Sequence, residues 1–307
     1  MRIVVTGAAG FIGHRLTARL LADGHDVVGV DCFLAASYDP AVKREALGPL
    51  LGHPRLAVAE RDLRTDPLDD VVAGAEALVH LAALPGLRTG QTRLYDACNR
   101  VATTRLAAAA TRAGVATVVH GSTSSVYGRV AAGDEHQPMA PVSDYGRSKR
   151  AAEAVMRAAG AVALRYFSVY GPGQRPDMAF HRFCEAILDG RPIVIHGDGR
   201  QERANTYVDD VVDATVAALT RGRPGEAYNI GGAEPIRLLD AVAVLAGAIG
   251  RAPVVRHGPD RPGDQRATQA DTTKASRELG WRPSTPPTSG LPAQVAWHLA
   301  RRRAVAA

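Results

Sequence analysis

The sequence predicts an α/β protein in which helices cover both faces of a parallel sheet. Short, nearly continuous apolar runs of strand length alternate with longer segments of helical periodicity. The runs lie at Arg2–Thr6, Asp26–Asp31, Leu56–Glu60, Ala77–Leu81, Val115–His120 and Ala161–Tyr166. Strands that are apolar at successive positions are buried on both faces. The right-handed crossover rule then predicts a doubly wound sheet.

Helical periodicity fills the gaps between these runs, at Phe11–Asp23, Asp96–Ala113 and Tyr145–Ala159. After about residue 167 the alternation becomes irregular. There we expect helices at Met178–Leu188 and at Asp209–Leu219, the second with its aspartates as N-caps, and strands at Ile193–His196 and Ala227–Ile230. Residues 1–167, rejoined by 205–232, are therefore expected to form the main domain. Residues 168–204 and 233–307 are expected to form a smaller, discontinuous lobe beside the carboxyl ends of the strands.

The composition of the 307 residues is that of an ordinary globular protein, with 46% hydrophobic and 22% charged residues, which argues against disorder. A net charge of +6 without a basic block gives no indication of nucleic-acid binding. No leader segment and no run of ~18 apolar residues is recognisable, so no membrane association is expected. Three cysteines far apart in the chain predict reduced thiols, a cytoplasmic location and no metal site.

A glycine-rich turn joins the first strand to the first helix. Gly7 permits the tight turn, Gly10 lets the backbone approach a pyrophosphate, and Gly13 lets helix and strand pack closely. Asp31 ends the next strand, where its carboxylate can accept from ribose hydroxyls and would repel a 2′-phosphate. The pattern predicts a Rossmann-type domain that binds NAD rather than NADP. The alternative is an ordinary βα turn.

Further cofactor contacts are expected from residues that follow the strands or open the first helix. Asp62 could equally contact the adenine or be a turn aspartate, and His80 is expected to be a core histidine. Small residues after the fourth strand leave room for the ribose and phosphates. Apart from the glycines and Asp31, the predicted contacts are Phe11, Ile12, Asp62, Leu63, Leu81, Ala82 and Ala83.

Tyr145 and Lys149 stand four residues apart at the start of a predicted helix and so share one face. A free tyrosine has a pKa near ~10, and a neighbouring ammonium and a positive nicotinamide would both lower it. Only three of the 37 basic residues are lysines, which supports a specific role for Lys149. The alternative is a solvated helix start. Thr123 weakens that alternative, because it lies at the carboxyl end of a strand and could bond both Tyr145 and a substrate hydroxyl.

The chain resembles the extended short-chain dehydrogenases/reductases that act on nucleotide sugars, over essentially its whole length. The segments that carry the resemblance, in the family's order, are TGAAGFIG, Asp31, HLAA, STSSVYG, YGRSK, RYFSVYGPGQRPDMAF, YVDDVVDA and YNIGG. The resemblance implies catalysis by Tyr145, Lys149 and Thr123 and a cofactor contact at Asn99. It also implies a homodimer built on two helices per subunit, for which the candidates are Asp96–Ala113 and Tyr145–Ala159.

The same resemblance narrows the reaction. The 4,6-dehydratases carry an Asp-Glu pair where this chain has Ser124 and Ser125, and UDP-glucuronate decarboxylases carry a glutamate at the position of Ser125. What remains is 4-epimerisation or ketoreduction. Ser168 and Arg175 lie where a hydroxyl and a guanidinium would meet the carboxylate of an acid sugar. Several segments look most like those of UDP-glucuronate 4-epimerases.

The expected activity is therefore NAD-dependent 4-epimerisation of UDP-glucuronate to UDP-galacturonate through a 4-keto intermediate. Forked guanidinium groups suit the diphosphate and the carboxylate. The residues expected to bind the UDP-sugar are Arg88, Thr123, Ser124, Ser125, Tyr145, Ser168, Arg175, Arg203, Arg261 and Asp264. The alternatives are 4-epimerisation of UDP-glucose or UDP-N-acetylglucosamine, ketoreduction or decarboxylation of a nucleotide sugar, and a non-catalytic NAD-binding protein.

Overall fold

The computed structural model of the chain describes residues 1–86, 90–259 and 267–306. Its centre is a seven-stranded sheet in the order β11-β6-β5-β4-β1-β2-β3 in which every neighbouring pair is parallel. The strands are β1 (Arg2–Thr6), β2 (Asp26–Asp31), β3 (Leu56–Glu60), β4 (Ala77–His80), β5 (Thr117–Thr123), β6 (Val162–Tyr166) and β11 (Ala227–Ile230). The order reverses at β1, between β4 and β2, so the predicted doubly wound sheet is confirmed.

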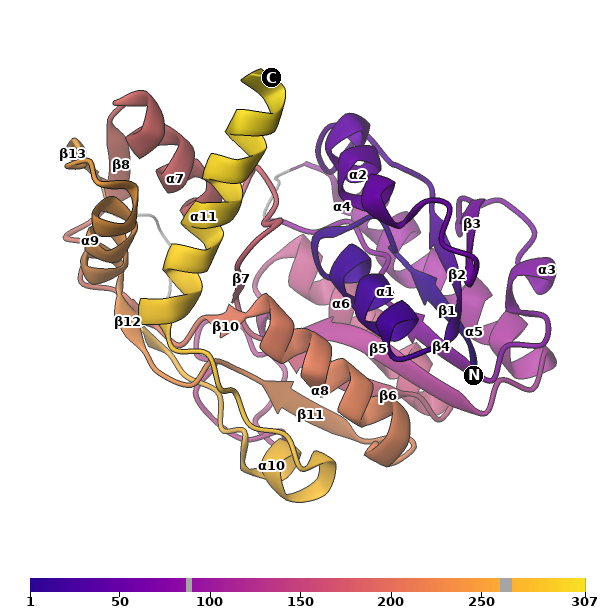
Figure 1. Cartoon of the computed structure of the whole chain (residues 1–307). Helices are drawn as coiled ribbons and strands as arrows, with labels where there is room; N and C mark the ends of the chain where they lie inside the picture. The colour runs from indigo at the N-terminus through magenta and orange to yellow at the C-terminus, as the bar shows by residue number, and fades with distance from the viewer. Residues whose placement is uncertain (87–89, 260–266, 307) are drawn as a thin grey trace.

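Helices cover both faces of this sheet (Figure 1). In β1, Ile3 and Val5 belong to one apolar cluster and Val4 to another, and all three are fully buried. The first cluster is closed by α1 (Phe11–Ala22) and α8 (Val208–Arg221), and the second by α5 (Ala102–Arg112) and α6 (Asp144–Ala158). Burial on both faces explains why the strands read as continuous apolar runs.

A smaller group of elements lies beside the sheet, at the left of Figure 1. Its helices α7 (Ala179–Asp189), α9 (Leu238–Ile249) and α11 (Pro287–Ala306) enclose a separate apolar cluster. The short strands that accompany them are β7 (Val169–Tyr170), β8 (Ile193–His196), β9 (Glu202–Arg203), β10 (Thr206–Tyr207), β12 (Ile236–Arg237), β13 (Val255–Gly258) and β14 (Ala267–Thr268).

The predicted domain boundaries stay a prediction, with one difference that the packing brings out. Helix α10 (Thr273–Leu279) and Trp281, which the sequence assigns to the smaller lobe, pack on α8 and belong to the apolar cluster of the main sheet. The indole of Trp281 donates to the carbonyl of Asp210 at 2.9 Å. The chain therefore returns to the main domain once more than expected.

Two helical predictions are wrong in detail. The segment expected as one helix over Asp96–Ala113 consists of α4 (Thr92–Tyr95), a π-helical stretch over Asp96–Val101, and α5. The segment after β2, where the sequence predicts no helix, contains α2 (Pro40–Leu47). Asp39 caps α2 by accepting from the N–H of Ala41 at 2.9 Å, and Pro40 takes the first helical position. Shorter helical pieces are α3 (Asp69–Val72) and the 3₁₀ turns Gly48–Leu50 and Ser124–Val126.

The N-cap expected from the aspartates of α8 is also wrong. The capping position is Tyr207, and its side chain makes no capping bond. Asp209 and Asp210 lie in the first turn instead, where acidic groups complement the helix dipole. Asp209 pairs with Arg15 of α1 at 2.6 Å, and Asp210 accepts from the hydroxyl of Ser284 at 2.9 Å. The two carboxylates thus join α8 to its neighbours rather than cap it.

Within the described ranges, no helix is long and apolar enough to cross a bilayer.

Candidate active site

The glycine turn after β1 has the close packing that the sequence predicts. Gly7 has a φ of +74°, and a Cβ on it would stand 2.7 Å from the amide nitrogen of Ala82. A Cβ on Gly13 would stand 1.9 Å from the carbonyl oxygen of Gly7, so α1 rests directly on the turn. A side chain at either position would push α1 or the end of β4 away from β1. Gly10 precedes the first residue of α1 and lies in the wall of a groove.

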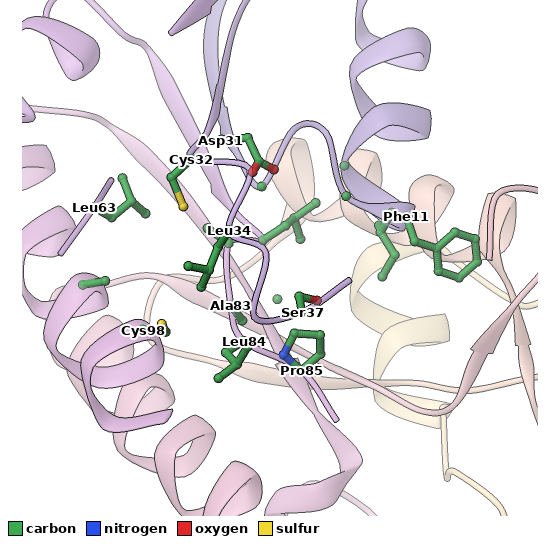
Figure 2. A pocket seen from close by; sticks show the side chains of 18 of the residues that line it. Phe11, Asp31, Cys32, Leu34, Ser37, Leu63, Ala83, Leu84, Pro85 and Cys98 are labelled. Atoms are coloured by element: carbon green, nitrogen blue, oxygen red, sulfur yellow. The ribbon is translucent and has the colours of Figure 1, made fainter. Parts of the chain in front are cut away.

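This groove runs along the carboxyl ends of the parallel strands, and Figure 2 shows side chains that line it. All but one of the predicted cofactor contacts line it. They are Gly7, Gly10, Phe11, Ile12, Gly13, Asp31, Asp62, Leu63, Leu81, Ala82, Ala83, Tyr145 and Lys149. The structure thus brings together residues predicted from five separate segments of the chain.

Asn99 is the exception, because it is not part of the groove wall. It is buried in the π-helical stretch, accepts from the N–H of Leu84 at 2.7 Å and donates to the hydroxyl of Ser148 at 2.9 Å. It joins the segment after β4 to α6. The geometry therefore gives Asn99 a supporting position behind the groove. Its neighbour Cys98 does line the groove.

Asp31 is held in a fixed orientation at the end of β2. Its carboxylate accepts from the backbone N–H of Phe33 at 2.8 Å and from that of Ala9 at 3.3 Å. The ammonium of Lys43, on α2, lies 3.6 Å from the same carboxylate, and both side chains are buried. Lys43 is not among the cofactor contacts predicted from the sequence. The structure places it in the groove wall next to Asp31.

Asp62 lines the groove after β3, but its carboxylate is engaged. Arg64 binds it with a shortest distance of 2.6 Å, and this guanidinium lowers the pKa of the Asp62 carboxyl. His80 is the core histidine that was expected: it is fully buried between the hydroxyls of Thr6 at 2.7 Å and Thr103 at 2.8 Å. Burial lowers the pKa of His80 to about 3.

Tyr145 opens α6 next to the end of β5. The strand reaches Thr123, three residues further than expected, so Gly121, Ser122 and Thr123 belong to it. Burial raises the pKa of the Tyr145 phenol, while its hydrogen bond with the Thr123 side chain and the charge of Arg175 lower it. Thr123 is therefore placed beside the phenol as predicted. The cation that acts on the phenol is Arg175 rather than Lys149.

Lys149 reaches deeper than the phenol. Its ammonium donates to the carbonyl oxygen of Gly121 at 2.6 Å and lies 3.5 Å from Nε2 of His120. Burial lowers the pKa of Lys149 to about 8, and burial followed by the charge of Lys149 lowers the pKa of His120. The hydrogen bond to the Gly121 carbonyl therefore holds the Lys149 ammonium in one position at the end of β5.

Arg175 lies where the groove meets a second cavity. It lines the groove together with Tyr145, whereas its neighbours Gln174 and Pro176 line the second cavity. Asp177 binds its Nε and Nη2, both at 3.0 Å. The predicted substrate residues Ser168 and Arg203 line the second cavity. The segment that carries Arg175 therefore separates a cofactor-sized groove from a cavity toward the smaller lobe.

The comparisons with known proteins agree with this geometry. The model of the NAD-dependent epimerase/dehydratase family matches residues 3–231. The chain belongs to this family. The match confirms the resemblance predicted from the motifs. It also confirms the expected dependence on NAD. The matched range ends just after β11, the last strand of the sheet.

Two curated relatives show how closely related family members differ in activity. A protein of Bacillus subtilis (strain 168), named as an uncharacterised UDP-glucose epimerase, is 37% identical over 97% of this chain and 98% of its own length. A dTDP-glucose 4,6-dehydratase of Streptomyces griseus is 36% identical over 96% of this chain and 93% of its own. Identity at this level therefore does not select the reaction within the family.

A solved structure of a relative supports the predicted fold class. The UDP-glucuronic acid 4-epimerase of Bacillus cereus, in complex with UDP-glucuronic acid and NAD, superposes with a TM-score of 0.93 at 35% identity. The match covers 98% of this chain and all of that one. The predicted fold class is confirmed over both the sheet and the smaller lobe.

Three predicted substrate residues, Arg88, Arg261 and Asp264, lie outside the described residues. Ser124 and Ser125 form the 3₁₀ turn after β5, where the hydroxyl of Thr123 accepts from the N–H of Ser125 at 3.2 Å. Neither serine is part of the wall of the groove or of the second cavity.

Sequence reasoning missed one side of the groove. The segment after β2 and helix α2 contribute to it, and none of their residues is among the predicted cofactor contacts. The Asp-Pro pair at 39–40 is a helix-start signal that was available in the sequence. The groove-lining residues from this side are Cys32, Leu34, Ser37, Tyr38 and Lys43.

Proposed function

We propose that this family member is an NAD-dependent 4-epimerase that interconverts UDP-glucuronate and UDP-galacturonate. The observation that carries the proposal is that Tyr145 and Arg175 line the same groove, with the Thr123 side chain hydrogen-bonded to the phenol. A base, a hydroxyl that orients the reacting hydroxyl, and a cation suited to a sugar carboxylate are thus available to one substrate. The B. cereus relative, crystallised with UDP-glucuronic acid and NAD, supports this choice of substrate and cofactor.

The residues present fit NAD. Gly7 and Gly13 leave no space for a Cβ, so backbone N–H groups at the start of α1 are open to a pyrophosphate. The buried Asp31 carboxylate at the end of β2 suits ribose hydroxyls. When bound, the nicotinamide supplies reversible hydride transfer at C4 of the sugar. Tyr145 and Lys149 line the same groove and would flank it.

In the proposed mechanism, the Tyr145 phenolate takes the proton of the C4 hydroxyl while Thr123 orients that hydroxyl. The C4–H bond breaks with its electron pair leaving as hydride, which gives a 4-keto sugar. The sugar then turns about its diphosphate link, the hydride returns to the other face of C4, and Tyr145 gives the proton back. Atoms and electrons balance, so no net oxidation occurs. Lys149, which is protonated below a pH of about 8, donates to the carbonyl oxygen of Gly121 and so holds the helix of Tyr145 at the end of β5.

Ser124 and Ser125 argue against the dehydratase reaction of the S. griseus relative. Elimination of water across C5 and C6 needs an acid and a base at those positions. Two hydroxyls of ordinary serine acidity supply neither at neutral pH. For the same reason the proposal excludes decarboxylation assisted by a carboxylate at Ser125.

The second candidate is 4-epimerisation of a neutral UDP-hexose, such as UDP-glucose or UDP-N-acetylglucosamine. The observation in its favour is that Asp177 already binds Nε and Nη2 of Arg175. Because the Asp177 carboxylate partly neutralises the guanidinium, Arg175 attracts the carboxylate of an acid sugar less strongly. The B. subtilis relative carries the name of a UDP-glucose epimerase.

Steady-state turnover of the three UDP-sugars by the purified protein with NAD separates these candidates. The proposal expects the highest kcat/KM for UDP-glucuronate, and the Tyr145→Phe variant serves as the inactive control. A higher kcat/KM for UDP-glucose or UDP-N-acetylglucosamine would establish the second candidate instead. Stoichiometric oxidation of NADH by a 4-keto sugar would identify a ketoreductase.

The proposal also retains a cytoplasmic homodimer whose interface is formed by α5 and α6. These helices pack side by side on one face of the sheet, which is the arrangement needed to meet the same pair from a second copy by two-fold symmetry. Light scattering coupled to size exclusion tests it: a mass of one chain would contradict the dimer.

A further inference from the structure

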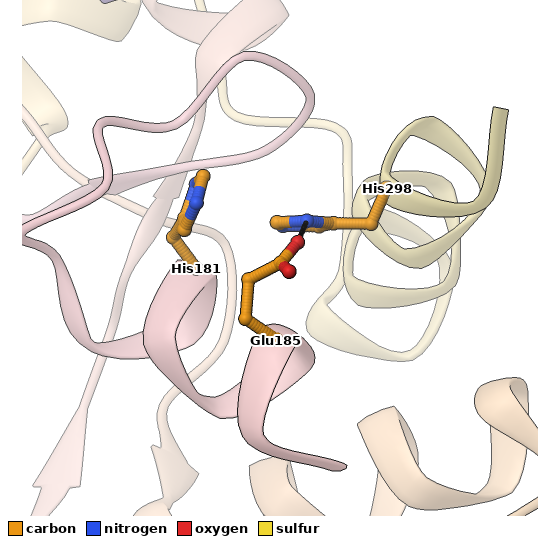
Figure 3. A group of neighbouring side chains, drawn as sticks. All are labelled: His181, Glu185 and His298. Carbon is orange, nitrogen blue, oxygen red and sulfur yellow. Dashed lines mark hydrogen bonds and ion pairs between the residues drawn. The ribbon is translucent and has the colours of Figure 1, made fainter. Parts of the chain in front are cut away.

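Two histidines and a glutamate meet between α7 and α11 (Figure 3), and none of the three lines the groove that contains Tyr145 and Lys149. His181 and Glu185 lie one turn apart on α7, and His298 reaches them from α11. One potential ligand atom from each residue lies within 4.8 Å of the other two. The imidazole rings have a centroid separation of 4.5 Å and an interplanar angle of 72°.

The hydrogen bonds of the two imidazoles determine which nitrogen carries the proton. Nδ1 of His181 bonds the carbonyl oxygen of Gln174 at 2.7 Å, and Nδ1 of His298 bonds Glu185 at 2.6 Å. A carbonyl and an ionised carboxylate only accept, so Nδ1 is the donor in both rings. In the neutral imidazole the lone pair is then on Nε2.

These are the surroundings of metal-binding histidines. A ligating imidazole usually donates its other N–H to a carboxylate or a backbone carbonyl, which fixes the tautomer and the ring orientation. His298 is 1% exposed, and its Nε2 is buried without a hydrogen-bond partner among the described residues.

We propose that His181 and His298 bind a divalent transition-metal ion, with Zn²⁺ as the expected ion, through their Nε2 atoms. Glu185 orients His298 in this site, and water in the second cavity, which both His181 and Glu185 line, completes the coordination. Zinc–nitrogen bonds of ~2.1 Å in a tetrahedral arrangement place donor atoms closer together than the limit of 4.8 Å within which one ligand atom of each residue lies here. Metal binding therefore requires the two imidazoles to move toward each other.

The local charges are compatible with a dication. Arg302 is engaged by Glu185 and also by Asp189 at 2.7 Å. Asp189 pairs with Arg191 at 2.8 Å as well, so these two carboxylates balance the two guanidinium groups.

The proposed ion would join the last helix of the chain to the segment that carries Arg175. Gln174 accepts from the N–H of His181 at 2.9 Å and from the amide of Gln294, on α11, at 2.9 Å. Metal binding at His181 and His298 therefore braces α7, α11 and residue 174 together. The proposed metal ion has a structural role. The proposal of this metal site does not depend on which sugar the protein acts on.

Metal binding to the untagged, EDTA-dialysed full-length protein tests this proposal. Wild type should bind one equivalent of Zn²⁺ with a rise in melting temperature. Co²⁺ at the same site should quench Trp297, whose ring lies 4.8 Å from His298 and 6.0 Å from His181. The other tryptophan, Trp281, is buried against α8 and should be unaffected.

The variants distinguish this site from adventitious binding. His298→Gln should abolish both the stoichiometric binding and the rise in melting temperature. Glu185→Gln keeps an acceptor for His298 but removes the charge, and should weaken binding by about 10–100-fold. The matched control is His136→Gln, because His136 has a side chain 89% exposed and distant in sequence from the cluster. It should bind as wild type does.

Equal binding by wild type and His298→Gln, or no binding by wild type, would overturn the proposal. Should the histidine variants fail to fold, ¹⁵N-detected NMR of the wild-type imidazoles decides. Zn²⁺ must then shift Nε2 of two histidines out of ten. A titration without such shifts would contradict the site, whatever sugar the enzyme acts on.

Discussion

The ammonium of Lys149 donates to the carbonyl oxygen of Gly121 at 2.6 Å, which ties α6 to the carboxyl end of β5. Tyr145 and Thr123 lie on the same two elements. The three proposed catalytic residues are thus positioned by one helix–strand contact. The pKa of the Lys149 ammonium, lowered to about 8 by burial, makes this contact sensitive to pH.

Activity should fall as the pH rises through about 8. Below that value Lys149 is protonated and donates to the carbonyl oxygen of Gly121, and above it this charge-assisted contact, which positions Tyr145 and Thr123, is weakened. Lys149→Arg, which stays charged, should move this alkaline limb upward at a lower kcat, and Lys149→Met should reduce kcat by about 10²–10⁴-fold. The measurement is kcat against pH for the three proteins. An unchanged alkaline limb in Lys149→Arg would show that another group titrates.

Lys149→Met should also raise the melting temperature at pH 7. Folding removes the charged Lys149 ammonium from water. The free-energy cost of this desolvation lowers the stability of wild type at neutral pH. Between about 8, the folded pKa, and ~10.4, the unfolded pKa, the unfolded chain binds more protons. The stability of wild type should therefore increase with pH across that window, and that of Lys149→Met should not show this increase.

Thr123→Val should lower kcat by roughly five- to tenfold, the equivalent of about 1 kcal/mol for one hydrogen bond. The Thr123 side chain bonds the Tyr145 phenol and lowers its pKa, so the loss should be larger at low pH. Thr123→Ser keeps the hydroxyl and is the matched control. Equal kcat values for the valine and serine variants would remove Thr123 from the mechanism.

Arg175→Met should decrease kcat/KM for UDP-glucuronate by about 10–100-fold, in line with a hydrogen bond to a charged group of ~1.5–3 kcal/mol. It should change kcat/KM for UDP-glucose much less. Asp177→Asn, which releases Nε and Nη2 of Arg175, should act in the opposite direction. A loss of the same size for both sugars would assign Arg175 to the diphosphate or to the fold instead of the carboxylate.

Gly13→Ala should destabilise the protein by more than the ~1–3 kcal/mol usual for overpacking. Its new Cβ would meet the carbonyl oxygen of Gly7 at 1.9 Å, and this backbone atom cannot give way. Gly247→Ala, in the interior of α9 with nothing within 4 Å, is the control and should stabilise by up to ~1 kcal/mol. Urea unfolding of both variants measures the difference.

Much of the fold follows from rules that are local in sequence. The residues of β1 alternate between two buried clusters, and such a strand must read as a continuous apolar run. The glycine turn follows from steric limits on single residues, as Gly7 and Gly13 show. The sequence also places Tyr145 and Lys149 on one helix face. These features could be predicted because each depends on a few neighbouring residues.

What could not be predicted depends on contacts between distant segments. The π-helical stretch over Asp96–Val101 lies within a segment that the sequence predicts as one continuous helix, and no Gly or Pro marks where it begins or ends. Lys43 meets Asp31 only because α2 folds over the groove. His298 meets His181 only because α11 crosses α7. No spacing in the sequence distinguishes these residues from others of the same type.

The most direct test of the account is the fate of UDP-glucuronate at C4 in the presence of the enzyme and NAD, followed by proton NMR and by absorbance at the NADH band. The account predicts the appearance of UDP-galacturonate until a fixed ratio of the two epimers is reached, with no accumulation of NADH and no pentose. It also predicts that Tyr145→Phe produces none. Release of CO₂ with formation of a UDP-pentose, or stoichiometric formation of NADH, would contradict it.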